Sequence, residues 1–151
     1  MENNFIKSVK VSLIIIYLVI AAGSIVRMTG SGMGCPDWPK CFGYWIPPTE
    51  RSQLDWLPNH EYTKGQVIIL DQELRIAERS FNSRLNYDPK NWEHYTKHDY
   101  ALFNPYHTWI EYLNRLLGAL AGLAVLVMTV LSFWLKKKKK IITSISFLIL
   151  L

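Results

Sequence analysis

A long apolar run near the end of the chain constrains its fold more than any other feature. Residues 116–135 form a nearly uncharged block, about as long as the ~20 residues that an α-helix needs to cross a bilayer. A second run, from Val9 to Val26, is interrupted only by Lys10 near its start and also predicts a spanning helix. A signal peptide would share its basic amino end, but the run is long for a signal core and Arg27 begins no small-x-small cleavage site. A retained helix is therefore favoured.

Lysines flank these two helices on one side of the membrane. Lys7 and Lys10 precede the first helix, and five lysines at 136–140 follow the second, whereas the stretch between the helices carries nearly balanced charge. The positive-inside rule puts the amino terminus and the lysine turn in the cytoplasm. The net charge of +5 equals the charge of those five lysines. We therefore attribute it to membrane topology and to attraction between the lysines and anionic lipid headgroups. No basic face for nucleic acid is visible, and we expect no nucleic-acid partner.

These features predict an all-α membrane protein with two transmembrane helices, the start of a third and a long extracytoplasmic loop. The eleven mostly apolar residues at 141–151 are too few to span a bilayer that needs ~20, so we expect a fragment cut inside its third helix. The predicted location is the cell (inner) membrane, with multiple passes. The predicted segments are a cytoplasmic amino terminus (1–8), transmembrane helix 1 (9–27), an extracytoplasmic loop with a Cys pair (28–107), transmembrane helix 2 (108–135), a cytoplasmic lysine turn (136–140) and the truncated helix 3 (141–151).

Three polar side chains lie in the first turns of the second helix. Glu111 precedes Asn114 by three residues and Arg115 by four, so all three share one face at the water-facing end. Ionisable groups at this depth usually face a partner or a ligand, although an interfacial ion pair that fixes helix depth is an equally good explanation. Gly118 and Gly122 follow in a small-xxx-small pattern that lets a backbone or a flat ligand approach closely. Together these residues predict an outward-facing pocket between helices.

The external loop opens with the segment Thr29-Gly-Ser-Gly-Met-Gly-Cys-Pro-Asp-Trp-Pro-Lys-Cys-Phe-Gly43. Its glycines and prolines predict a tight turn, and the absence of a Gly-Lys-Ser/Thr ending excludes a phosphate loop. Cys35 and Cys41 are the only cysteines and lie in the oxidising compartment, so we expect an intraloop disulfide. That disulfide would be a structural staple or, alternatively, a strained redox-active pair.

The rest of the loop is polar, with scattered tryptophans that indicate a small packed cap. Apolar residues at roughly helical spacing predict a helical piece around Gln66 to Phe81. His94 and His98 are four residues apart, but no further ligand completes a metal set, so we predict surface histidines and no metal site. His107 lies two helical turns before Asn114 and is best explained as part of an aromatic belt.

Two of these motifs resemble those of a known family. The segment from Thr29 to Gly43, after a helix that ends in Val26-Arg27, is similar to the first-loop signature of the haem A synthase family. The segment Trp109-Ile-Glu-Tyr-Leu-Asn-Arg-Leu-Leu-Gly118 resembles that family's Glu-x-x-His-Arg motif at the start of its second helix. The resemblance implies an eight-helix bundle of two similar halves, of which this chain would cover about the first quarter plus its loop. It also implies an oxidoreductase that oxidises the C8 methyl of haem O to a formyl group, giving haem A for terminal oxidases.

The resemblance assigns roles to individual positions. Glu111 matches the motif's glutamate and is the candidate catalytic residue. Asn114, Arg115 and Gly118 are candidate cofactor-binding residues, with Arg115 suited to a haem propionate. Cys35 and Cys41 match the family's disulfide pair. The departure is Asn114, where the motif has histidine, because an amide is a far poorer ligand for haem iron than an imidazole.

The resemblance also implies cofactors and partners. Haem O would be the substrate, haem A the product and haem b a cofactor whose site lies mostly outside this segment. Membrane lipid, haem O synthase and a quinone or thiol redox partner are the expected partners. We expect a segment this short to be inactive by itself. The alternatives are a membrane thiol–disulfide oxidoreductase that uses the loop cysteines, and a non-catalytic haem or oxidase assembly subunit.

Overall fold

The structure is a computed structural model that describes residues 2–96 and 103–135. The chain divides into two units, which are described separately. The first unit contains most of the two long helices, and the second, Thr29–Tyr112, includes the first turns of the second helix. The predicted lysine turn at 136–140 and the predicted start of a third helix at 141–151 lie outside the described residues.

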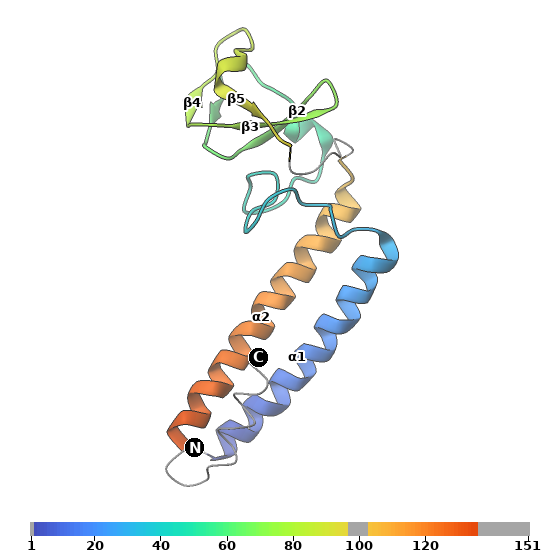
Figure 1. The fold of residues 1–151 in the computed structure, drawn as a ribbon, viewed down its shortest axis with the longest axis vertical. Coiled ribbons are helices and arrows are strands. Elements are labelled where there is room, and N and C mark those ends of the chain that lie inside the picture. Colours follow the sequence, from blue (N-terminus) through green and yellow to red (C-terminus); the bar gives the residue numbers. More distant parts are fainter. Residues whose placement is uncertain (1, 97–102, 136–151) are drawn as a thin grey trace. The chain divides into compact units, whose positions relative to one another are not determined.

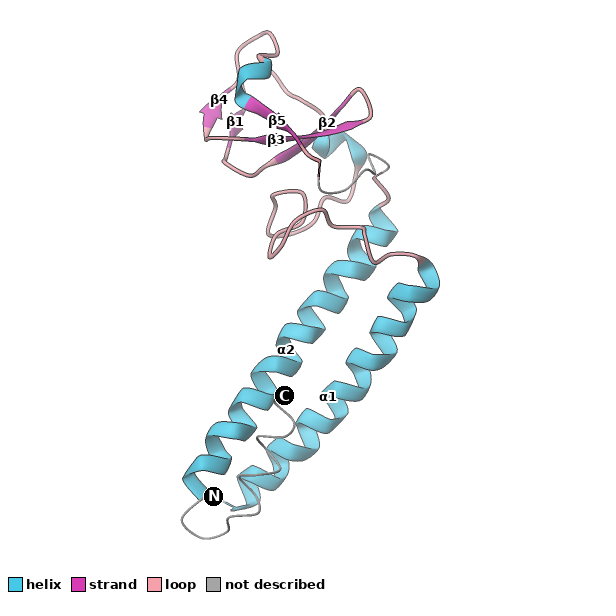
Figure 2. Cartoon of the chain, viewed as in Figure 1, coloured by secondary structure: helices cyan, strands magenta, loops and turns pink. Residues whose placement is uncertain are grey.

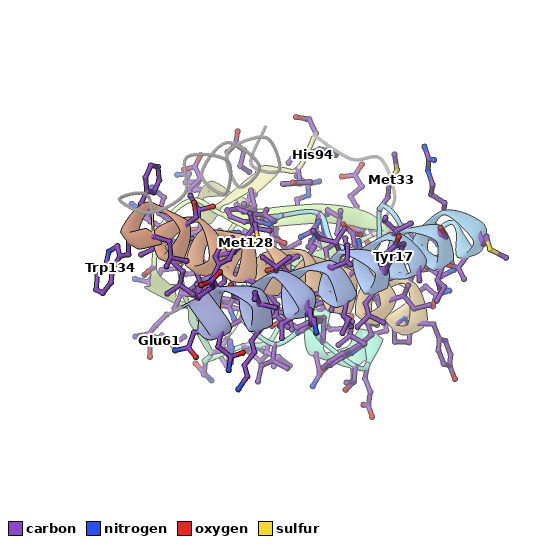
Figure 3. The ribbon with its side chains drawn as sticks, turned by 90° about the horizontal axis from the view of Figure 1, so that it is seen from below. Tyr17, Met33, Glu61, His94, Met128 and Trp134 are labelled. Carbon is purple, nitrogen blue, oxygen red and sulfur yellow. A yellow bond between two sulfur atoms is a disulfide. The ribbon has the colours of Figure 1, made fainter. Side chains whose placement is uncertain are left out.

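Both predicted spans lie within long apolar helices, α1 (Glu2–Thr29) and α2 (Pro105–Leu135), which Figure 1 shows running in opposite directions. With 28 and 31 residues, the helices are ~42 and ~46 Å long at ~1.5 Å per residue, more than the ~30 Å of a bilayer core. Large apolar side chains remain exposed along both of them, and Trp134 projects outward near the end of α2 (Figure 3). Such surfaces suit a lipid environment, so the helices have the length and composition to cross a membrane.

The second unit contains five short strands (Figure 2), so the expectation of an all-α fold is wrong for the described residues. A three-stranded antiparallel sheet has the order β2 (Val67–Leu70), β3 (Glu73–Ala77) and β5 (Trp92–His94). A second pair joins β1 (Glu61–Tyr62) to β4 (Phe81–Asn82). Two short 3₁₀ helices complete the elements, Arg51–Leu54 and Pro89–Asn91.

The helix predicted around Gln66 to Phe81 is a β-hairpin. Leu70 pairs with Glu73, and Asp71 and Gln72 between them have φ angles of 50° and 64°. Two successive residues at positive φ form the type I′ turn whose twist matches paired strands. Before this turn the chain reads Val-Ile-Ile-Leu, and β-branched residues favour strands over helices. The spacing of the apolar residues suits a two-sided hairpin as well as a helix, and the turn decides between them.

The hairpin buries both of its faces in two hydrophobic clusters. One face, with Val67, Ile69 and Leu74, packs with both cysteines. The other face, with Ile68 and Ala77, packs with Tyr62 and with the aromatic side chains of Trp56, Phe81, Tyr87 and Trp92. The sheet therefore shares its core with the disulfide loop.

Candidate functional site

A disulfide between Cys35 and Cys41 closes the glycine-rich loop, as predicted. Two further interactions brace the ring: the Gly43 amide donates to Asp37 Oδ2 at 2.8 Å, and Cys41 forms an isolated antiparallel bridge with Tyr44. Cys35 and Cys41 are only 3% and 0% exposed. The disulfide is thus a buried part of a braced loop.

Glu111 on α2 binds this loop directly. The backbone N–H of Cys35 donates to Glu111 Oε2 at 2.8 Å, and the Glu111 side chain is only 7% exposed. Three residues earlier, the Thr108 hydroxyl donates to the Gly34 carbonyl at 2.9 Å. The Cys35 Sγ atom lies 3.6 Å from the Thr108 carbonyl oxygen. These contacts join two segments more than 70 positions apart in the sequence, and we call them the Glu111 clamp.

Gly34 allows the clamp to form because its backbone lies against the backbone of α2. A Cβ atom built on Gly34 would lie 2.5 Å from the carbonyl carbon and oxygen of His107 and 2.6 Å from the Thr108 nitrogen. No side chain larger than hydrogen fits there without moving the loop. Gly30 is needed for a different reason, because its φ of 68° lies in the left-handed region.

The start of α2 is fixed by its own cap. Asn104 Oδ1 accepts hydrogen bonds from the amides of Tyr106 (3.0 Å) and His107 (3.4 Å), and Pro105 occupies the first helical position. Capping satisfies amides that a helix amino terminus otherwise leaves without partners. The cap therefore sets where α2 begins, and with it the position of Glu111 two turns later.

His107 lines a cavity of about 380 Å³ beside the clamp. The other lining residues are mainly apolar: Gly30, Met33, Gly34, Pro36, Phe42, Leu74 and Asn104. His94 and His60 lie elsewhere, where His94 Nε2 is 3.3 Å from Glu73 Oε2 and His60 packs on Tyr62. His98 lies outside the described residues. Residues 2–96 and 103–135 contain no group of three or more His, Cys, Asp or Glu arranged to hold a metal ion.

The remaining predicted site residues lie on the next turns of α2. The helix is continuous from Pro105 to Leu135, so Asn114 and Arg115 keep their spacing of three and four residues from Glu111. Asn114 Oδ1 is buried and has no hydrogen-bond partner among the described residues. A Cβ atom built on Gly118 meets nothing within 4 Å in the described part of the chain. The ligand-binding roles of these three residues stay predictions.

Sequence analysis missed three residues that fasten the loop. Besides Thr108, Tyr112 donates from its hydroxyl to the Trp45 carbonyl at 2.6 Å, and the Tyr95 hydroxyl donates to the Pro36 carbonyl. Thr108 lies three residues before Glu111 on the same helix face, a spacing that could have suggested a shared role. Tyr95 reaches its partner only through the tertiary fold, so no local pattern could have identified it.

Two helices that are long and apolar enough to cross a membrane, and a loop closed by a buried disulfide, are features of a membrane protein with a folded loop domain. The family model described as cytochrome oxidase assembly protein, COX15-CtaA, matches residues 8–85. The chain therefore belongs to this family, the haem A synthase family, as its two motifs predicted.

Curated relatives carry the same family name. A heme A synthase of Shewanella oneidensis is 32% identical over 65 residues, which cover 43% of this chain and 17% of the relative. That of Orientia tsutsugamushi (strain Ikeda) is 25% identical over 135 residues, 87% of this chain and 29% of the relative. That of Geobacillus thermodenitrificans is 40% identical over 53 residues, 34% of this chain and 17% of the relative. The chain thus spans less than a third of the length of these relatives, and no solved structure matches it.

Proposed function

We propose that this protein oxidises the C8 methyl group of haem O to a formyl group, giving haem A for terminal oxidases. The observation that carries the proposal is the hydrogen bond from the Cys35 amide to Glu111, because it joins the two motifs that resemble the family. The relatives named heme A synthase support the same activity for this protein. In this proposal the protein is an oxidoreductase, and Glu111 is its catalytic residue in this segment.

Glu111 has the setting that a general base needs. Oxidation of a methyl group to a formyl group takes its oxygen from water and releases protons and electrons, and a positioned carboxylate can accept the protons. A backbone amide at 2.8 Å fixes one carboxylate oxygen, and burial keeps bulk water away. A base whose orientation is fixed before the substrate binds loses less entropy in the reaction.

The following turns of α2 would bind the edge of the porphyrin. The guanidinium of Arg115 suits a propionate, because its planar fork can donate two parallel hydrogen bonds to a carboxylate. The buried Asn114 Oδ1 needs a donor that the described residues do not supply. Gly118 presents backbone without a side chain, with nothing within 4 Å of its Cβ position in the described chain. A flat ligand could approach α2 closely at that point.

Haem b is the resident cofactor that the family implies, and the residues of this segment fit only its periphery. Arg115 suits a propionate, whereas the amide of Asn114 is a poor ligand for iron. We therefore propose that the iron of haem b is held by residues outside this segment. We also propose that position 114 faces the iron of a bound haem without ligating it, so replacing Asn114 with histidine in the complete protein should produce a six-coordinate low-spin spectrum. An unchanged absorption spectrum would contradict the proposal that position 114 faces haem iron.

We further propose the cell (inner) membrane as the location, with the amino terminus in the cytoplasm and the disulfide loop outside. The distribution of lysines supports this orientation, since Lys7, Lys10 and the five lysines at 136–140 flank the helices on one side. Haem O synthase would deliver the substrate in this membrane. A quinone, or the oxidised disulfide form of a thiol redox partner, would accept the electrons.

The buried cysteines argue against a thiol–disulfide oxidoreductase. Exchange requires a thiolate to attack an accessible sulfur, and the two sulfurs belong to residues that are 3% and 0% exposed. Cys35→Ser is therefore expected to lower haem A formation without abolishing it. Complete loss of activity in a folded Cys35→Ser protein would favour a redox role for the pair.

The decisive experiment expresses the complete gene in a host that makes haem O but lacks its own haem A synthase. Extracted haems are separated by reversed-phase chromatography. The wild type should convert haem O to haem A, and Glu111→Gln should accumulate haem O. The amide oxygen of glutamine still accepts from the Cys35 N–H, so the loop stays fastened while the base is lost.

Glu61→Gln is the matched control, because Glu61 is an exposed carboxylate on β1. It should leave haem A formation unchanged. Normal haem A formation by Glu111→Gln would remove Glu111 from the chemistry. A wild-type protein that is present in the membrane with haem O and makes no haem A would overturn the proposed function itself.

A further inference from the structure

The disulfide loop exposes large apolar side chains that the folded unit leaves uncovered. Trp38 is 78% exposed and Trp45 is 67% exposed, and Ile46 beside it is also exposed. In the strand region, residues 61–96, Leu85 is the only large hydrophobic side chain that is exposed. A cluster of exposed apolar side chains within one short segment indicates a contact surface.

The segment that carries these side chains is braced before any partner binds. The disulfide, the Asp37–Gly43 hydrogen bond and the bridge between Cys41 and Tyr44 hold its backbone. The two tryptophans are therefore presented by an ordered backbone, so little conformational entropy is lost on binding.

The Glu111 clamp fixes the height of this segment along α2. Trp45 is tied through its carbonyl to the Tyr112 hydroxyl, and Cys35 is tied through its amide to Glu111. Both helix residues lie four or five positions before Leu116, where the uncharged block begins, which is ~6–8 Å of helix at ~1.5 Å per residue. The polar interface on each side of a bilayer is ~5–8 Å thick. The segment is thus attached at the depth of lipid headgroups.

The chemistry of the exposed groups suits that depth. Tryptophan combines a large apolar ring with an N–H donor and is enriched at membrane interfaces. The Lys40 ammonium lies 5.5 Å from the centre of the Trp45 ring, and its charge can also reach an anionic headgroup. We propose that Trp38, Lys40 and Trp45 form an interfacial anchor that binds phospholipid headgroups beside α2.

The anchor is tested in the complete protein by a photoreactive residue, benzoylphenylalanine, placed at position 38 or 45. The protein is reconstituted in vesicles of phosphatidylethanolamine and phosphatidylglycerol, irradiated and analysed by mass spectrometry. We expect adducts with the mass of one phospholipid at both positions. Leu126→benzoylphenylalanine, on the exposed face of α2, is the positive control, and Leu85→benzoylphenylalanine, at a site that is 76% exposed, is the negative control.

The alternative occupant is another part of the same polypeptide, since this chain covers only 17–29% of its relatives. Crosslinks from positions 38 and 45 to peptides of the protein would overturn the lipid anchor. So would the absence of any adduct at these positions when position 126 captures lipid. The outcome does not depend on haem chemistry, so it is separate from the proposed function.

A second measurement avoids the bulky probe. Lipids brominated near the headgroup quench nearby tryptophans, so Trp38→Phe and Trp45→Phe should each reduce the quenchable part of the fluorescence. Trp56→Phe, in the aromatic cluster of the strands, should leave that part unchanged. Equal quenching in all three variants would contradict the anchor.

Discussion

Replacing Gly34 with alanine should separate the disulfide loop from Glu111. The new Cβ would lie 2.5 Å from the carbonyl carbon and oxygen of His107, whereas an ordinary contact begins near 3.4 Å. The obstructing atoms belong to the backbone, which cannot rotate away as the end of a side chain can. The loop and α2 must therefore move apart by about 0.9 Å, the difference between those two distances.

That displacement is large enough to break the clamp. It would lengthen the 2.8 Å bond between the Cys35 amide and Glu111 to about 3.7 Å, beyond hydrogen-bonding range. Leaving a buried carboxylate without this donor costs about 1–3 kcal/mol, and weakening the bond from Thr108 to Gly34 adds about 1 kcal/mol. A total of about 2–4 kcal/mol corresponds to a roughly 30- to 700-fold larger open population, at about 1.4 kcal/mol per factor of ten.

Hydrogen exchange of the Cys35 amide measures this opening directly. In the complete protein in lipid nanodiscs, Gly34→Ala should accelerate exchange in the peptide that contains Cys35 by that factor. Gly23→Ala is the matched control, because a Cβ at Gly23 meets no atom of the described residues within 4 Å. Protection of β2 and β3 should stay near wild type, which separates local opening from unfolding. Unchanged protection of Cys35 in Gly34→Ala would refute the argument that Gly34 holds the clamp closed.

Three further predictions concern the groups around the clamp. Thr108→Val removes the hydroxyl that binds the Gly34 carbonyl and should cost about 1 kcal/mol in exchange protection at Cys35, whereas Thr129→Val, which removes a buried hydroxyl bonded within α2, should leave protection at Cys35 unchanged. Burial raises the pKa of the Tyr62 phenol above 10, so its contribution to stability is complete below pH 10 and falls above it, because the unfolded phenol ionises first. Denaturant titrations between pH 8 and 11 should show this loss in the wild type and a smaller one in Tyr62→Phe. Leu74→Ala, in the cluster shared with the disulfide, should lower the free energy of unfolding by about 2–5 kcal/mol, whereas Leu85→Ala at an exposed site should change it by less than about 0.5 kcal/mol.

The features that sequence analysis predicted are those with a strong local signal. Long apolar runs predicted α1 and α2, because a bilayer core requires about twenty apolar residues in succession. The disulfide followed from two cysteines that are close in sequence and braced by prolines. Glu111 was selected because an ionisable group at this depth usually faces a partner or a ligand; the structure shows its hydrogen bond to the loop, and its catalytic role stays a prediction.

The hairpin and the clamp could not be predicted in the same way. Val67 to Ala77 has apolar residues at spacings that suit either a helix or two strands, and only the backbone of Asp71 and Gln72 selects the strands. The hydrogen-bond donor to Glu111 is the backbone amide of Cys35. Nearly every residue has such an amide, so the sequence does not indicate which one is used. Contacts made by the backbone become visible only when the tertiary fold is known.

The loop contributes mainly backbone groups to the Glu111 clamp. The sequence and length of the strand region can therefore vary without removing those groups. Two hydrogen bonds connect the strand region to the disulfide segment. The Val67 amide donates to the Phe42 carbonyl, and the Tyr95 hydroxyl donates to the Pro36 carbonyl. Loop-closure entropy rises only slowly with length, so many residues can be inserted between such fixed points. What the site requires of the strands is apolar packing against the disulfide, which Val67 and Leu74 provide. The strands therefore help to hold the loop that binds Glu111, through apolar packing against the disulfide.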